Sequence, residues 1–180
     1  RHPGRLRLVP LIYHMEKVGF NALPIIGLIS FLIGVVLAYQ GATQLQRFGA
    51  EIFVINLVGV SVLREIAILL TAIVVAGRSG SAFTAEIGSM VVNEEVDAIR
   101  TLGLDPMEVL VLPRVLALVI PLPLLAFFAD MMGLFGGMLM CWGALEISPG
   151  LFLERLQGAV SQWSFWVGMI KAPFFAFFIS

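Results

Sequence analysis

Cysteine, histidine and charge are scarce in this chain, and each scarcity excludes a class of protein. The 180 residues include one cysteine, Cys141, which leaves no internal disulfide and no cluster of thiolate ligands. The two histidines, His2 and His14, lie near the N-terminus without metal-ligand spacing, so we expect no metal site and no catalytic site. Charged residues make up 13% of the chain and the net charge is −1, which provides no basic surface for nucleic acid.

Apolar residues are abundant instead. They make up 59% of the chain, whereas soluble domains are roughly half apolar and about a quarter charged. We therefore expect an all-α polytopic membrane protein, with residues 1–180 forming one domain. The chain lacks an initiator methionine and stops inside an apolar run, so we expect a fragment whose last span is cut short.

Uncharged runs mark the expected spans, because a helix needs about 20 apolar residues to cross the hydrocarbon core. No charge lies between Val18 and Gln46, and Asp130 is the single charge over 115–145. We expect an interfacial helix over 1–20, span 1 over 23–46, span 2 and its extension over 52–90, a short water-side helix over 93–103, span 3 over 107–145, a periplasmic connection over 146–162, and a truncated span 4 over 164–180.

The first 17 residues carry four basic side chains and one acidic one. Apolar residues recur among them at helical spacing, which favours a helix lying in the membrane interface over an ordinary juxtamembrane tail. The positive charge places this end on the cytoplasmic side.

Small residues recur every fourth position after span 2, in one series from Ala76 to Gly88 and another from Gly77 to Ser89. Small residues let helix backbones approach closely in lipid. We expect helix packing at Gly77, Gly80, Ser81, Ala85 and Gly88, and a similar close-packing face at Ala129, Gly133 and Gly137.

A short acidic segment follows. Asn93 is a favourable N-cap, Glu94 and Glu95 suit the first turn, and Gly103 suits the C-terminal cap. The pattern predicts an amphipathic helix of about three turns, which either docks on a partner or is a plain loop helix.

Charges inside the spans are the other candidates for function, because ionisable residues in a membrane are costly and face the bundle interior or a water-filled cavity. Arg64 and Glu65 lie in the middle of span 2 and point about 100° apart on an α-helix, so each needs its own partner. Each charged residue therefore has two alternative roles. Glu65 either lines a cavity or joins a structural network between helices.

Asp130 either makes a buried hydrogen bond to a neighbouring helix or acts in gating. Lys171 either reaches the membrane interface or pairs with an acid across the bundle.

Several motifs resemble the MlaE-type permease family, the membrane subunits of ABC systems that move lipids. They are Leu63-Arg64-Glu65, Ala76-Gly77-Arg78-Ser79-Gly80-Ser81-Ala82, Thr84-Ala85-Glu86-Ile87-Gly88, the segment from Glu94 to Gly103, and Asp105-Pro106. The resemblance implies five spans in the intact protein, a homodimer, cytoplasmic ATPase subunits and a periplasmic MCE-domain protein. It also implies lipid contacts on the outer half of span 1 and on span 2.

On this basis we expect a multi-pass permease subunit of the bacterial inner membrane that moves phospholipid between the inner and outer membranes. The chain is expected not to be an enzyme: it lacks the Gly-x4-Gly-Lys-Ser/Thr phosphate loop, so ATP and Mg would bind a partner subunit. The expected lipid-binding residues are Leu37, Gln44, Leu45, Phe48, Arg64 and Glu65. The expected ATPase-coupling residues are Glu94, Glu95, Val96, Asp97, Ile99, Arg100 and Leu102.

Two alternative functions stay open: an ion-coupled secondary transporter that uses Glu65 and Asp130, and a membrane scaffold without a transport cavity. The stripe from Leu37 to Phe48, which follows helical spacing only if span 1 continues through the turn, is either a wall for acyl chains or ordinary helix packing.

Overall fold

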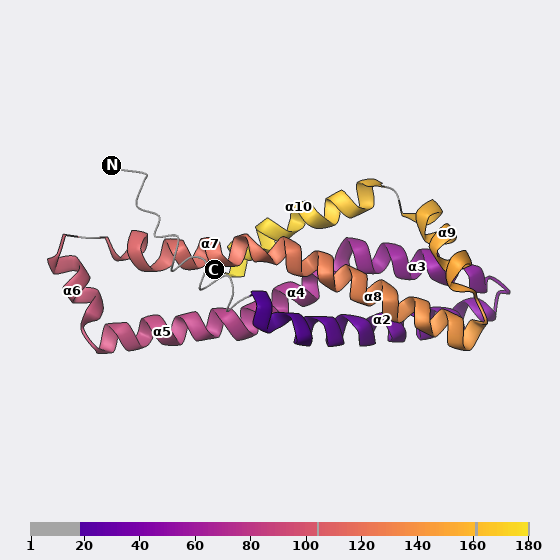
Figure 1. The fold of residues 1–180 in the computed structure, drawn as a ribbon, viewed down its shortest axis with the longest axis horizontal. Coiled ribbons are helices and arrows are strands. Elements are labelled where there is room, and N and C mark those ends of the chain that lie inside the picture. The colour runs from indigo at the N-terminus through magenta and orange to yellow at the C-terminus, as the bar shows by residue number, and fades with distance from the viewer. Residues whose placement is uncertain (1–18, 104, 161, 180) are drawn as a thin grey trace.

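A computed structural model describes residues 19–103, 105–160 and 162–179, which form an elongated bundle of helices (Figure 1). The predicted all-α class is confirmed, and the predicted interfacial helix lies almost wholly outside the described residues. The elements in chain order are η1 (Phe20–Ala22), α2 (Leu23–Gln46), η2 (Glu51–Phe53), α3 (Val54–Ser61), η3 (Val62–Ile66), α4 (Ala67–Val75), η4 (Ala76–Gly80), α5 (Ser81–Val92), α6 (Glu95–Thr101), η5 (Met107–Val111), α7 (Leu112–Val119), α8 (Pro121–Leu145), α9 (Pro149–Ala159) and α10 (Gln162–Ile179).

Three continuous helical stretches among the described residues are long and apolar enough to cross a membrane. They cover Phe20–Gln46, Glu51–Val92 and Val109–Leu145. This confirms the three full spans expected from the uncharged runs and the continuation of span 2 past Ala76. Pro121 divides the third stretch into two helices. It has no N–H to donate to the preceding turn, and α7 ends at Val119 just before it, where α8 begins.

Helices α2 and α8 run side by side in the half of the molecule that also contains α3 and α4 (Figure 1). They touch through glycine: a methyl group at Gly34 would overlap the Gly133 carbonyl, and one at Gly136 would overlap the Phe31 carbonyl. Ala129, Gly133 and Gly137 are buried, so the close-packing face predicted on span 3 is confirmed. Close backbone approach is how helices associate in lipid, where burial of apolar surface supplies little driving force.

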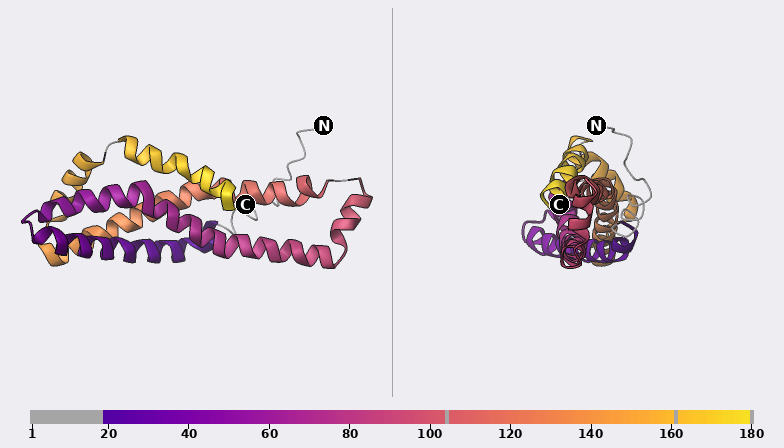
Figure 2. Two further views of the ribbon diagram at one scale, coloured as in Figure 1. Left: turned by 180° about the vertical axis from the view of Figure 1, so that it is seen from behind. Right: turned by 90° about the vertical axis from the view of Figure 1, so that its left-hand side faces the viewer.

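The other half of the molecule is a long hairpin. Helices α5 and α7 extend beyond the N-terminal end of α2, and α6 crosses between them at the tip of the hairpin (Figures 1 and 2). The predicted small-residue series lies here, and Gly77, Ser81, Ala85 and Gly88 are exposed. A Cβ added at Gly77 or Gly88 meets nothing within 4 Å. Among the described residues these four positions therefore have no close packing partner, whereas Gly80 is half-buried and lines a cavity.

Two local predictions were wrong. Asn93 does not cap α6: it ends α5, its N–H donating to the Ser89 carbonyl at 3.0 Å. Glu94 takes the N-cap position with φ of 60° and no side-chain cap hydrogen bond, so α6 has seven residues rather than three turns. Gly103, with φ of +74°, does adopt the left-handed conformation expected after the helix, and its N–H donates to the Arg100 carbonyl at 2.9 Å.

The expected connection over 146–162 contains a helix, α9, at the end of the molecule opposite α6 (Figure 1). Ser148 caps it, accepting a hydrogen bond from the Leu151 N–H at 3.3 Å, and Pro149 occupies its first turn. Its buried Phe152 and its Leu156, which lies against Gly59 of α3, fasten this helix to the bundle.

Candidate functional site

A π-helical turn in the middle of span 2 carries the first candidate site. The η3 turn contains both Arg64 and Glu65, and single π-helical turns occur frequently at functional sites. Glu65 lies eleven residues beyond Val54, the first residue of α3. At 1.5 Å per residue this separation is about 16 Å along the helix, which is close to half of a hydrocarbon core about 30 Å thick.

Lys171 of α10 completes this site. Its Nζ lies 2.7 Å from Glu65 Oε1 and donates also to the Arg64 carbonyl at 3.5 Å. Gly168, one turn earlier, makes the approach possible, because a Cβ there would lie 2.5 Å from the Leu63 carbonyl oxygen. Of the two alternatives left open for Lys171, the structure shows the pairing with an acid across the bundle.

Arg64 and Glu65 also approach each other, with 3.9 Å between Arg64 Nε and Glu65 Oε1. Glu65 thus has a partner of its own in Lys171, as expected, but the expectation that Arg64 and Glu65 do not meet was wrong. A π turn holds more residues than an α turn, so successive side chains diverge less. We call Arg64, Glu65 and Lys171 the mid-membrane charge cluster.

The cluster has two positive groups and one negative group, a net charge of +1. Its side chains are not buried in the single chain: the exposed fractions are 54% for Arg64, 52% for Glu65 and 35% for Lys171. Charges at this depth are strongly disfavoured against lipid tails. The exposed side of the cluster therefore requires a water-filled cavity, a polar ligand or a second protein surface.

The expected apolar wall on span 1 is only partly present. Helix α2 ends at Gln46, so Phe48 lies in the following turn and is not on the helical stripe, contrary to prediction. Leu37 and Leu45 pack against the core, whereas Gln44 is exposed. Ordinary packing thus accounts for part of the stripe.

The stripe and the charge cluster also differ in depth. A Cβ on Gly41 would contact Leu57 and Val54, so the start of α3 lies beside the C-terminal part of α2. Glu65 lies eight residues deeper than Leu57, about 12 Å along the helix. The two sets of predicted lipid-binding residues occupy successive levels of the protein and do not form one compact pocket.

The predicted ATPase-coupling residues gather at the hairpin tip. The two glutamates Glu94 and Glu95 are exposed, and Asp97 and Arg100 form an exposed ion pair at 3.4 Å. Apolar surface lies beside these charges: Leu102 is 75% exposed and Val92 is 83% exposed. Val96 and Ile99 are half-buried, so of the three residues predicted to form one apolar edge only Leu102 is fully presented.

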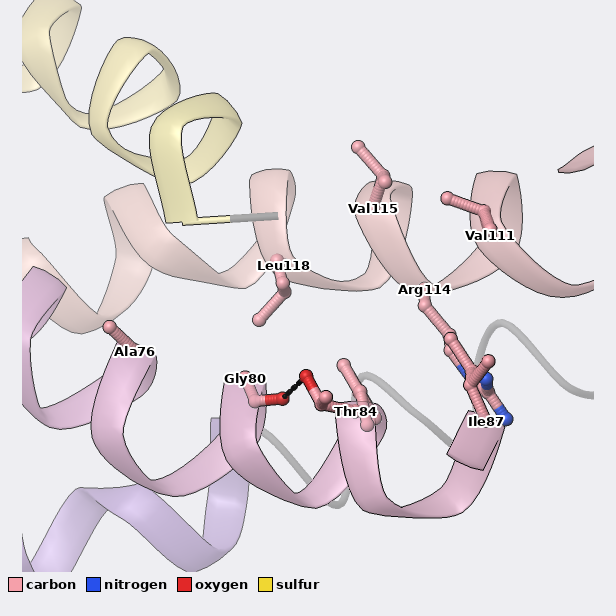
Figure 3. A pocket seen from close by; sticks show the side chains of 9 residues that line it. Ala76, Gly80, Thr84, Ile87, Val111, Arg114, Val115 and Leu118 are labelled. Carbon is pink, nitrogen blue, oxygen red and sulfur yellow. Dashed lines mark hydrogen bonds between the residues drawn. The ribbon is translucent and has the colours of Figure 1, made fainter. Parts of the chain in front are cut away.

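Sequence reasoning assigned no role to Arg114, which lies between the two arms of the hairpin. Figure 3 shows it reaching from α7 toward Ile87 of α5, beside a cavity of about 200 Å³. The Arg114 side chain is only 7% exposed, and its Nη2 lies 3.4 Å from Glu86 Oε2. In the sequence it precedes a long apolar run, a position that equally suits an arginine at the membrane interface.

Asp130 is buried in α8, which fits its interpretation as a partner in a buried hydrogen bond. Its Oδ1 has no hydrogen-bond partner among the described residues, and no ion pair of the described chain joins it to the charge cluster.

Comparison with known proteins decides the family. The family model described as Permease MlaE matches residues 11–180. The chain belongs to the MlaE permease family. A protein named "Probable ABC transporter permease protein" from Rickettsia prowazekii is 37% identical over 175 residues, covering 97% of this chain and 68% of the relative.

Two further relatives carry more informative names. The intermembrane phospholipid transport system permease protein MlaE of Haemophilus influenzae is 39% identical, over 92% of this chain and 64% of that protein. The chloroplastic protein TRIGALACTOSYLDIACYLGLYCEROL 1 of Arabidopsis thaliana is 31% identical, over 98% of this chain and 51% of its own length. The MlaE family and its ABC permeases give no support to the ion-coupled alternative.

Proposed function

We propose that this chain is the permease subunit of an ABC transporter that moves phospholipid between the inner and outer membranes and exchanges lipid with a periplasmic MCE-domain protein. It does not hydrolyse ATP itself; ATP and Mg bind separate cytoplasmic ATPase subunits. Membership of the MlaE family and the name of the Haemophilus relative support this proposal.

The mid-membrane charge cluster is the observation that carries the proposal. A half-exposed cluster of net charge +1 is unstable against lipid tails but suits an anionic phosphate, to which arginine and lysine both donate. In this assignment Lys171 and Arg64 bind the headgroup phosphate. Glu65 holds Lys171 in place, and a second permease copy closes the cavity on the exposed side.

The hairpin tip serves as the docking surface for the ATPase. Its exposed carboxylates are electrostatically complementary to a basic groove on the partner, and the adjacent Leu102 and Val92 provide apolar contact. In this proposal the N-terminus and the tip lie on the cytoplasmic side of the inner membrane and α9 lies on the periplasmic side; the basic N-terminal residues support this orientation.

The test is mass spectrometry of lipids and subunits bound to the intact purified complex. We expect phospholipid and an ATPase subunit to copurify with the unsubstituted permease. The Lys171→Met variant is expected to retain about a tenth of the bound phospholipid, since it removes a direct charge-assisted contact.

Glu154→Gln is the matched control, because Glu154 is exposed on α9 far from the cluster. It should bind phospholipid normally. A complex without phospholipid, or a Lys171→Met variant with a full complement, would contradict the assignment of the cluster.

A further inference from the structure

We propose that Arg114 is a positioning residue for ATP coupling: it clamps α5 to α7 so that the two arms of the hairpin move as one unit when α6 is displaced. The inference rests on the proposed function, and it adds a residue outside both the lipid-binding and the docking sets.

The partners of Arg114 share one face of α5. Besides Glu86, its Nη2 reaches Met90 Sδ at 3.9 Å, and its guanidinium carbon lies 5.8 Å from the centre of the Phe83 ring. Phe83, Glu86 and Met90 follow helical spacing, so one side chain from α7 meets a continuous ridge of α5. A planar guanidinium can hold a carboxylate and an aromatic face together, which a lysine ammonium does less well.

This arrangement is costly if it serves stability alone. Arg114 is 6% exposed, and its Nη1 is buried without a hydrogen-bond partner among the described residues. The Glu86 side chain is 43% exposed, so solvent screens its attraction for Arg114, and the pair does not by itself repay the burial of the guanidinium. What the charged contact adds is a fixed register between the two arms.

The position of the clamp fits transmission of movement. The cavity lies between the arms and Arg114 helps to line it. Gly80, Thr84 and Leu118 line it towards the bundle, and Ile87 and Val111 line it on the side of the tip (Figure 3). The arms are thus incompletely packed between the clamp and the bundle. A push on α6 enters both arms at the tip, and Arg114 holds the arms in one register part-way to the bundle, where the cavity otherwise separates them.

The experiment measures lipid transferred and ATP hydrolysed in the same proteoliposomes, with the full-length permease, its ATPase and a fluorescent phospholipid. We expect Arg114→Met to lower the lipid transferred per ATP about tenfold, while the ATPase copurifies in normal stoichiometry. Arg114→Lys should fall between this variant and the unsubstituted complex. Arg155→Met, which removes an exposed arginine on α9, is the matched control and should keep the normal ratio.

Each outcome decides. If Arg114→Met cannot be purified, Arg114→Lys replaces it, and a normal transfer ratio in a folded variant overturns the proposal. Loss of ATPase binding also overturns it, because Arg114 would then belong to the docking surface. If the unsubstituted complex transfers no lipid on ATP hydrolysis, the proposed function fails and this inference fails with it. If the unsubstituted complex transfers lipid and the Arg114 variant does so at the same ratio, only the inference about Arg114 fails.

Discussion

The two halves of this molecule contain similar small residues and use them differently. In the half formed by α2, α3 and α8, Gly34 and Gly136 bring backbones into direct contact. In the hairpin formed by α5, α6 and α7, Gly77 and Gly88 face open space and a cavity separates the arms. Spacing of small residues therefore indicates where a close partner is permitted, and the tertiary structure shows whether the partner lies in the same chain.

The largest effect is expected where the packing is tightest. Gly34→Val places branched atoms where the Gly133 carbonyl already lies. Overpacking of this kind costs about 1–3 kcal/mol or more, so the variant should lose much of its folded population in a thermal-unfolding assay in detergent. Gly143→Val is the control, because a Cβ at Gly143 meets nothing within 4 Å. Equal stability of the two variants would remove the distinction between contacting and free glycines.

An intermediate effect, on coupling rather than on folding, is expected at the hairpin tip. Asp97→Arg reverses an exposed charge and breaks the pair with Arg100. Because exposed ion pairs contribute about 0–1 kcal/mol, stability should scarcely change. Repulsion from a basic groove on the partner should instead lower ATP-driven lipid transfer about tenfold. Normal transfer and ATPase stimulation would show that the tip does not dock in this way.

The smallest effect on the single chain is expected at Gly88. A Cβ at Gly88 meets none of the described residues within 4 Å, so Gly88→Val should change the free energy of unfolding by less than about 0.5 kcal/mol. If the exposed series packs against a second permease copy, the same variant should weaken the dimer, which native mass spectrometry measures. An unchanged dimer would leave the series without a packing role in the permease pair.

The membrane spans were predictable because they depend on composition over long windows. A run such as 18–46 without a charge has few stable alternatives to a helix in lipid, since every backbone polar group must be satisfied within the helix. Arg64 and Glu65 were also predictable as candidates, because charges are conspicuous in an apolar run. Their partner was not: Lys171 lies 106 residues from Glu65, and a π turn sets the geometry between them.

Local signals were weaker where several compete. Asn93 suits an N-cap, but it lies at the end of α5 and serves that helix instead. Ser148 and Pro149 do carry the expected signal for the start of a helix, and α9 follows them. Arg114 has no sequence signal beyond its charge, because its role depends on a ridge of α5 that the chain reaches only after reversing direction at α6.

By itself the sequence determined the membrane class, the spans, the resemblance to the MlaE family and the charged residues worth testing. These follow from hydropathy and from contiguous motifs. Only the tertiary structure decided that Glu65 meets Lys171 and that Arg114 joins α5 to α7. It also decided that the glycines of α2 and α8 make contact, while Gly77 of η4 and Gly88 of α5 do not. Each of these depends on how helices distant in the chain approach one another, which is set by the shapes of two surfaces at once.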